Sequence, residues 1–156
     1  MSEICSICGN KLIPRFLNIP DSLTSLTFTI YKCPKCRLGH TIPQPENLTA
    51  HYDNYYGNRH GFTANYCTKR RLRFAVAAMK KQPGKRLLDI GCGDGSFLLA
   101  ARDAGWDVMG TEINPEPGRA AGLDVRENIS QMSDCAQFDC ITMWHTLEHM
   151  RYIKST

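Results

Sequence analysis

The second half of the chain alternates between short apolar runs and segments of helical character. Four apolar runs have the length of strands and lie at residues 86–90, 106–113, 123–126 and 138–144. Between them, residues 96–104 predict a helix that Ser96 is able to cap, and residues 115–121 predict a poorer helix with a proline at its start. This order of strands and helices predicts an α/β fold with a parallel sheet and right-handed crossovers.

The first half of the chain has a different texture. Five prolines fall before residue 46, around a single run that alternates apolar residues with threonine, at residues 26–31. This describes a small loop-rich module, which is too short to be stabilised by apolar burial alone. Residues 47–57 predict a short helix with aromatic side chains, and residues 62–81 predict a longer helix that ends before Pro83.

These patterns divide the chain into three parts. We expect a front module at residues 1–46, a helical linker or cap at residues 47–84, and an α/β domain at residues 85–156. The N-terminus has no basic stretch followed by an apolar run, and apolar runs such as residues 97–101 are far too short to cross a bilayer. We therefore predict a cytoplasmic chain without membrane contact.

The cysteines of the front module have the spacing of metal ligands. Cys5, Cys8, Cys33 and Cys36 form two Cys-x-x-Cys pairs at the two ends of the excursion that holds the predicted strand. Four thiolates in a tetrahedron are a typical ligand set of structural zinc, and binding supplies folding free energy. Redox pairs are the alternative, but those usually lie beside a βαβ strand. The spacing predicts a zinc-ribbon-like site.

The first predicted strand of the second half leads into a turn rich in glycine. Asp89, Gly91, Gly93 and Gly95 form the pattern Asp-x-Gly-x-Gly-x-Gly immediately before the helix. Glycines let the backbone turn tightly and approach a ligand, and the helix start offers free N–H groups. The dinucleotide fingerprint would need glycine at Ser96, and an acid at the strand end suits a cationic ligand better than a pyrophosphate.

Three segments in order resemble the class I S-adenosylmethionine-dependent methyltransferases. They are LLDIGCGDGSFL, VMGTEINP and FDCITMWHTLEH, and the resemblance covers residues 85–150. It implies S-adenosylmethionine as cofactor and a partial Rossmann-like sheet with strands in the order 3-2-1-4. The front module resembles, more loosely, the zinc-binding segments that precede some bacterial and archaeal methyltransferases, including those that act on sugars.

The resemblance also implies a set of cofactor contacts. Residues of the glycine-rich turn would line the amino-acid portion and ribose of the cofactor, namely Asp89, Gly91, Cys92, Gly93 and Gly95. Glu112 would accept hydrogen bonds from the ribose hydroxyls, and Ile113 would pack on the adenine.

Residues after the fourth strand would face the reactive end of the cofactor. Met143, Trp144 and His145 would lie near the methionine end and the methyl group. Trp144 is equally well explained as a core residue. His145 would act as the general base for a hydroxyl or amine acceptor, although a structural histidine explains it as well.

Two features bear on partners. Residues 67–86 hold eight Lys or Arg and no acid, which indicates either a phosphate-contacting surface or a solvated helix face. A full domain of the family continues beyond the fourth strand, so we expect a truncated chain of doubtful activity, with that strand as an apolar edge. We expect a dimer or a partner chain at this edge, and an isolated monomer in solution would contradict that prediction.

The sequence favours methyl transfer to a small-molecule or saccharide acceptor. One rival is an RNA-binding methyltransferase that uses the zinc ribbon and the basic helix. A second rival is a non-catalytic subunit that keeps the cofactor fold only to hold a partner. A nicotinamide-binding protein is a more distant fourth.

Overall fold

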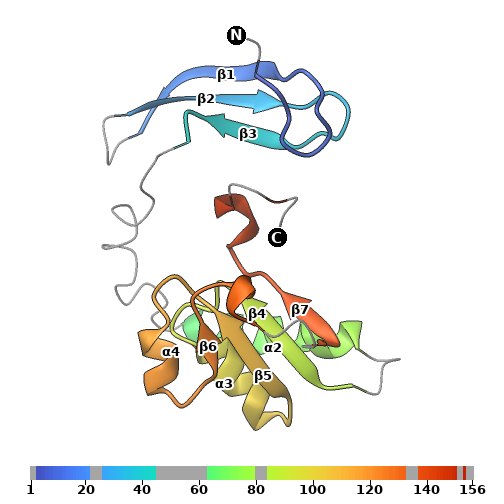
Figure 1. Cartoon of the computed structure of the whole chain (residues 1–156), viewed down its shortest axis with the longest axis vertical. Helices are drawn as coiled ribbons and strands as arrows, with labels where there is room; N and C mark the ends of the chain where they lie inside the picture. The colour runs from blue at the N-terminus through green and yellow to red at the C-terminus, as the bar shows by residue number, and fades with distance from the viewer. Residues whose placement is uncertain are drawn as a thin grey trace. The chain divides into compact units, whose positions relative to one another are not determined.

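The computed structural model describes residues 3–21, 26–44, 63–79, 84–132, 137–150 and 153. It separates into two compact units, Met1–Arg59 with Tyr152–Thr156, and His60–Arg151. Figure 1 labels the elements of each unit. The predicted boundaries after residues 46 and 84 remain predictions, and the helix predicted at residues 47–57 lies outside the described residues.

The first unit contains a three-stranded antiparallel sheet in the order β1-β2-β3. Its strands are β1 Ile13–Pro20, β2 Thr27–Lys32 and β3 Gly39–Ile42. The sequence predicted β2 and missed its two neighbours. All eight residues of β1 are exposed and its pairing with β2 is shifted at two points, so β1 has no buried face that would impose an alternating pattern.

The second unit is a four-stranded parallel sheet with helices against it. Its elements are α2 Ala64–Ala78, β4 Arg86–Ile90, α3 Ser96–Asp103, β5 Asp107–Thr111, α4 Glu116–Ala120, β6 Val125–Arg126, the 3-10 turn Ile129–Gln131, β7 Cys140–Thr142 and the 3-10 turn Leu147–His149. The strand order is β6-β5-β4-β7, with all three pairings parallel. The predicted α/β class and the order 3-2-1-4 are therefore confirmed.

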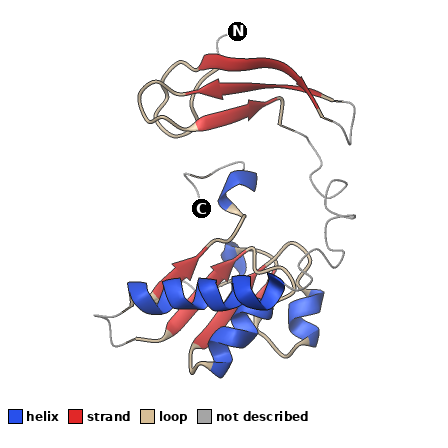
Figure 2. Cartoon of the chain, turned by 180° about the vertical axis from the view of Figure 1, so that it is seen from behind, coloured by secondary structure: helices blue, strands red, loops and turns tan. Residues whose placement is uncertain are grey.

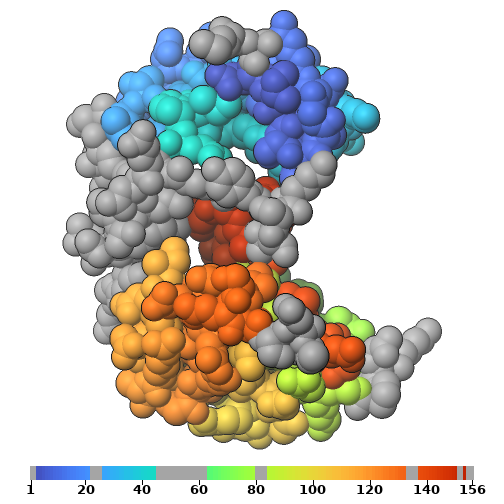
Figure 3. All heavy atoms as spheres, viewed as in Figure 1, coloured from blue at the N-terminus to red at the C-terminus, as the bar shows by residue number. Residues whose placement is uncertain are grey.

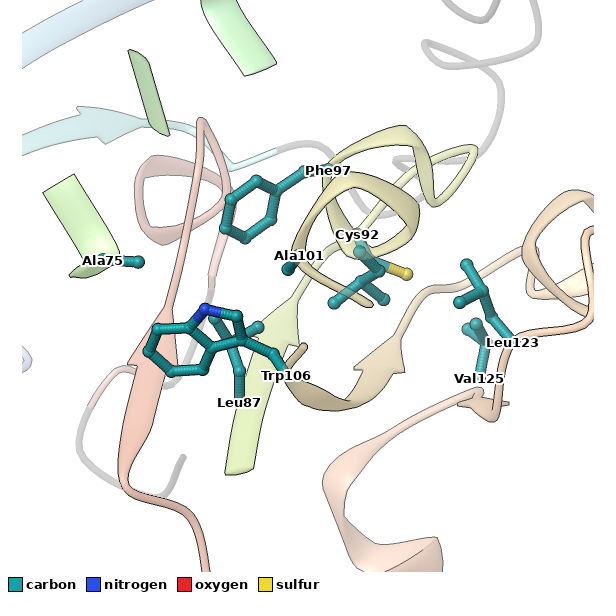
Figure 4. Packing of buried hydrophobic residues seen from close by; sticks show 9 residues of the cluster. Ala75, Leu87, Cys92, Phe97, Ala101, Trp106, Leu123 and Val125 are labelled. Atoms are coloured by element: carbon teal, nitrogen blue, oxygen red, sulfur yellow. The ribbon is translucent and has the colours of Figure 1, made fainter. Parts of the chain in front are cut away.

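Helices α2 and α3 close one side of the sheet. Figure 2 shows α2 crossing the strands. In the space-filling view of Figure 3, the α4 and β6 region, in orange, lies on the visible face of this unit. Figure 4 shows the core of this unit. It joins side chains from both helices, from β4 and β6, and from the turns between elements: Ala75, Leu87, Cys92, Phe97, Leu98, Ala101, Trp106, Leu123 and Val125. Phe97 of α3 and Leu87 of β4 are 1% and 0% exposed and belong to this one cluster.

The start of α3 corrects one prediction. Ser96 does not cap the helix, because the N-cap position falls on Gly95 with φ of +80°. The backbone N–H of Ser96 instead donates to Asp94 Oδ1 at 2.9 Å. The turn needs a residue with left-handed backbone immediately before the helix, and Gly95 takes that position. The N–H of Ser96 is therefore satisfied by the carboxylate of Asp94, two residues upstream.

β7 pairs with β4 along one side and lies at the edge of the described sheet. Ile141 on this strand is 58% exposed. Association through this edge remains a prediction. Among the described residues, no helix has the length and apolar character needed to cross a membrane.

Gly110 in β5 leaves no room for a side chain. A Cβ atom built there would lie 2.7 Å from both Cys92 Sγ and Leu98 Cδ1, which are buried. We expect Gly110→Ala to lower the free energy of unfolding by about 1–3 kcal/mol, measured by chemical denaturation. Adding Cys92→Ala should return part of that loss because it removes one of the two clashing atoms. Wild-type stability for Gly110→Ala alone would contradict this packing.

Candidate functional site

The loop between β4 and α3 carries left-handed backbone at alternate residues. Gly91, Gly93 and Gly95 have φ of +74°, +59° and +80°. The N–H groups of Gly91 and Cys92 both donate to Thr111 O, at 2.8 and 3.0 Å, and this holds the loop against the end of β5. The sequence pattern therefore corresponds to three positions at which side chains are disfavoured.

The three glycines differ in what surrounds them. A Cβ atom on Gly91 would overlap the side chain of Thr146, and one on Gly95 would overlap Leu123. A Cβ atom on Gly93 would meet nothing within 4 Å. Gly91 and Gly95 thus serve close packing as well as the turn, whereas Gly93 presents bare backbone to open space.

Glu112 lies beside this open glycine. Its residue is 8% exposed and follows directly after β5. Gly93 N–H donates to Glu112 Oε2 at 2.8 Å, and Ile113 N–H donates to Oε1 at 2.9 Å. The structure therefore brings together the glycine loop and the acid that the resemblance assigns to one site. Ile113, the next residue, is 68% exposed.

Asp89 lies at the carboxyl end of β4, 2% exposed. Burial raises its pKa to about 7, and the negative charge of Glu112 adds to the rise. Two groups oppose it: the hydroxyl of Thr142, which donates to Asp89 Oδ1 at 2.6 Å, and the positive charge of Arg71. Asp89 is thus protonated as the pH falls through about 7, and a nearby cation would favour its ionised form.

Cys92 belongs to the core beneath the loop. Burial raises the pKa of its thiol to about 12, with further contributions from the charges of Asp89 and Glu112. Its side chain is a neutral thiol that packs near Gly110. The cofactor contact implied for Cys92 remains a prediction, and its backbone is the part that lies in the loop.

The segment after β7 has a mixed environment. The Trp144 ring packs edge to face on Phe97 with centroids 5.8 Å apart, and Arg71 Cζ lies 5.4 Å from the same ring. Met143 is 36% exposed. His145 has φ of +57°, is exposed, and its Nδ1 lies 3.7 Å from Glu148 Oε1. The predicted roles of Met143, Trp144 and His145 toward the cofactor remain predictions.

Sequence reasoning missed two residues at this site. Thr142 lies inside the segment FDCITMW, but it is identified by its register opposite Asp89 in the pairing of β7 with β4, which the sequence does not show. The charge pattern places Arg71 only within the basic band, because a count of charges does not show which side of a helix faces the sheet.

The first unit brings the four predicted cysteines together. The sulfurs of Cys5, Cys8, Cys33 and Cys36 all lie within 4.8 Å of one another. Cys5 Sγ and Cys36 Sγ are 3.5 Å apart, and Cys8 Sγ and Cys33 Sγ are 3.4 Å apart. Thiolates around zinc at about 2.3 Å lie about 3.8 Å from one another, so a small contraction or expansion of this cluster fits the ion.

The two cysteine turns have the same backbone design. Cys5 N–H donates to Asn10 O and Gly9 N–H to Cys5 O, at 2.9 and 3.0 Å. Cys33 N–H donates to Leu38 O and Arg37 N–H to Cys33 O, at the same distances. Each turn therefore places its two sulfurs on one side, as a pair of ligands.

The sulfurs of the cluster differ in pKa: the Leu38 N–H lowers that of Cys36, but burial and the neighbouring thiols raise it to about 12. Burial of Cys33 raises the pKa of its thiol, but the N–H of Cys36 and the neighbouring thiols bring the pKa down to about 6. A thiolate is the form that binds metal. Four sulfurs from the protein would complete a tetrahedral zinc site, which would leave no position for substrate.

We expect the purified chain to hold one zinc ion per chain, measured by elemental analysis. Cys33→Ala should release the metal and make the first unit sensitive to proteolysis, because the ion contributes folding free energy. Cys67→Ala, which changes a half-buried cysteine of α2 outside the cluster, is the matched control. Equal zinc content in Cys33→Ala and the wild type would contradict the metal assignment.

Comparison with known proteins agrees with this geometry. A family model described as a methyltransferase domain matches residues 58–156, which is more than half of the chain and includes the glycine loop and Glu112. No curated protein matches the chain. The chain therefore belongs to the class I S-adenosylmethionine-dependent methyltransferase domain family.

Proposed function

We propose that the second unit binds S-adenosylmethionine at the loop after β4 and transfers its methyl group to a small-molecule acceptor, with saccharides as a candidate class. The observation that carries the proposal is the open backbone of Gly93 beside the carboxylate of Glu112. A ligand that contacts the backbone of Gly93 would lie beside the carboxylate of Glu112, which can accept hydrogen bonds from its hydroxyl groups. Membership of the family supports methyl transfer in general, and the acceptor class is our inference.

Different residues around the loop would bind different parts of the cofactor. Asp89 and the glycine backbone would take the amino-acid portion, and Glu112 would accept the ribose hydroxyls. Glu112 would keep one oxygen near Gly93 N–H while it does so, because a carboxylate offers about four lone pairs. The exposed side chain of Ile113 would form the apolar platform for the adenine.

The chemistry asks mainly for alignment. When bound, the cofactor supplies a methyl group that is already activated by its sulfonium. The protein's own contribution is to orient the acceptor and to exclude water from the site. The zinc centre would take no part in this step, because its four ligands all come from the protein, and we assign it a structural role.

A second candidate function has an observation of its own. The exposed side of α2 carries cations interleaved with aromatic rings, namely Tyr66, Lys69, Arg70, Arg73 and Phe74. Arg70 Cζ lies 5.4 Å from the Phe74 ring, and none of these three cations forms a salt bridge with a described acid. Such a surface fits RNA, whose phosphates and bases bind cations and aromatic rings.

A non-catalytic role as a partner subunit is the third candidate. It predicts no heat of binding with S-adenosylhomocysteine at millimolar concentration. Measurable binding of S-adenosylhomocysteine together with methyl transfer would exclude this role.

Glu112→Ala should weaken the binding of S-adenosylhomocysteine by about 1–3 kcal/mol, because it removes a charged acceptor for the ribose. The measurement is titration calorimetry at a pH above 7. Glu116→Ala on α4 is the control, since it removes a similar acid that is 75% exposed and paired with Arg119. An affinity equal to wild type in Glu112→Ala, with the fold intact by circular dichroism, would remove Glu112 from the site.

The RNA candidate has a salt signature. If the α2 surface binds RNA, the affinity for a labelled mixed-sequence RNA should fall steeply with salt, and Arg70→Gln with Arg73→Gln should reduce the slope of log K against log salt by about 1.4–1.8. The control pair Arg102→Gln with Arg126→Gln removes the same charge from other elements of the unit. Absence of RNA binding at low salt would reject this candidate and favour the small-molecule acceptor.

A further inference from the structure

The two sides of the β1-β2-β3 sheet differ in what they contact. Tyr31 and Ile42 point to one side and pack on the buried cluster that includes two of the zinc-ligand cysteines. Residues directly opposite in an antiparallel pair share a side, so the register assigns the other side as well. That side, which we call the open face, holds Ile13, Phe16, Ile19, Phe28, Ile30, Lys32 and Thr41. A solvated side of an antiparallel sheet is normally polar, but five of these seven residues are apolar.

Two irregularities in β1 direct its apolar residues to the open face. Residues three apart in a regular strand point to opposite sides. The register of β1 on β2 shifts on each side of Phe16, so Phe16 lies opposite Ile30. Ile19 lies opposite Phe28 on the same face. Phe16 and Ile19 remain 56% and 37% exposed, so the open face presents apolar side chains to solvent.

The outer edge of β1 is poorly suited to pairing with another strand. Pro14 and Pro20 have no N–H to donate, and Asn18 has left-handed backbone with φ of +52°. Prolines and bulges are features that protect an edge strand from the addition of a further strand. A partner of this unit would therefore pack on the open face rather than extend the sheet.

The open face carries a projecting ring next to a hollow. The hollow has a volume of about 220 Å³ and is lined by Ile19, Pro20, Asp21, Phe28, Ile30 and Thr41. Phe16 is not among these residues and projects beside them, because it lies opposite Ile30. A cavity of about 150 Å³ holds a benzene molecule. The hollow is therefore large enough for one phenylalanine ring.

Charges of opposite sign lie at the two ends of this arrangement. Lys32 lies opposite Ile13, beyond Phe16. Arg15 Cζ lies 6.0 Å from the centroid of the Phe16 ring, so the end with the projecting ring carries two cations. Asp21 follows directly after β1 and lines the hollow. Along the sheet, the order is cation, projecting ring, hollow and acid.

A two-fold axis through the open face would match each of these features with its complement. It would place the Phe16 ring of one copy in the hollow of the second copy, and Lys32 of one copy beside Asp21 of the second. We propose that two copies of this chain pack their open faces together as an isologous dimer. This inference does not depend on methyl transfer.

The size of the open face sets the expected strength of the dimer. Three strands of about six residues give a face of about 300 Å² from the standard strand and residue spacings. Each partner of a stable complex buries roughly 800 Å². The dimer should therefore be weak and reversible.

Sedimentation equilibrium of the full chain, over micromolar to millimolar concentrations, tests the proposal. The wild type should show a reversible equilibrium between one and two copies. Phe16→Ser should weaken dimerisation by at least about tenfold, because it removes the ring from both halves of the interface. Leu17→Ser is the matched control, since Leu17 is the next residue of β1, is 65% exposed and does not line the hollow. It should leave the equilibrium unchanged, and circular dichroism checks that each variant is folded.

A charge exchange tests the two-fold arrangement itself. Lys32→Glu and Asp21→Lys should each weaken the dimer by about 2–30-fold, because the axis repeats each charge pair twice. The double variant should restore dimerisation to that of the wild type, since it re-forms both pairs with their signs exchanged. An effect on the fold of the unit alone would not produce this rescue. Absence of rescue in a folded double variant would overturn the arrangement.

Other outcomes would also overturn the open-face dimer. A wild-type chain that stays monomeric over the whole concentration range would do so. Growth beyond two copies would contradict it as well, because an isologous contact closes at the dimer. Ile141→Ser changes the exposed residue of the β7 edge, where the sequence predicts association. Loss of the dimer in Ile141→Ser, with no effect of Phe16→Ser, would assign the contact to that edge instead.

Discussion

The hydrogen bond from Gly93 N–H to Glu112 Oε2 joins the ends of two neighbouring strands into one site. β4 and β5 pair in register up to Ile90 and Thr111, so the loop after one strand and the acid after the other begin at the same level of the sheet. Thr111 O then accepts both Gly91 N–H and Cys92 N–H. The left-handed turn is thereby pulled across the sheet edge, and the open side of Gly93 meets the carboxylate. The other oxygen of Glu112 accepts the N–H of Ile113, and this fixes the backbone of Ile113 beside the loop.

The buried charges of Asp89 and Glu112 constrain which ligands the site binds. Asp89 and Glu112 are both buried, and the charge of Glu112 raises the pKa of Asp89. Thr142 and Arg71 compensate for only part of this cost, since the pKa still lies near 7. A ligand with a sulfonium and an ammonium would bring the missing positive charge, whereas a pyrophosphate would add negative charge beside two acids. Electrostatics therefore favours the cofactor of the methyltransferase family over a dinucleotide.

The elements predicted well from sequence are those with a buried side. The sequence predicts β4 with its observed bounds, α3 and β2 to within one residue at each end, and α2 to within three residues, because apolar residues mark their buried sides. The strands at residues 106–113 and 138–144 were predicted too long, since apolar residues continue past the last paired residue into turns. β1 and β3 were missed because β1 buries none of its side chains and β3 has four residues.

Predicting the site depended on a different kind of signal. The glycines, Asp89 and Glu112 belong to motifs whose spacing along the chain reflects strand ends that meet in space. Thr142 contacts Asp89 from a strand, and the charge of Arg71 acts on Asp89 from a helix; neither separation in sequence follows a spacing rule. Their part follows from packing: the burial of Ala75 sets the rotation of α2, and the pairing of β7 with β4 puts Thr142 opposite Asp89. Such contacts are tertiary, and a single sequence does not record them.

The first unit shows why a metal would be needed where apolar burial is small. Among the residues of this unit that the structure describes, the buried cluster consists of Cys5, Leu12 and Cys33, and two of these are ligand candidates. A single buried leucine contributes about 1.5–3 kcal/mol, while ordering the backbone costs about 1–2 kcal/mol for each residue. The strain at Arg37, whose φ of +68° equals that of Gly9 in the other turn, adds to the deficit. Both turns nevertheless adopt the same geometry. This is the expected result if four bonds to one shared ion outweigh the backbone preferences of Gly9 and Arg37.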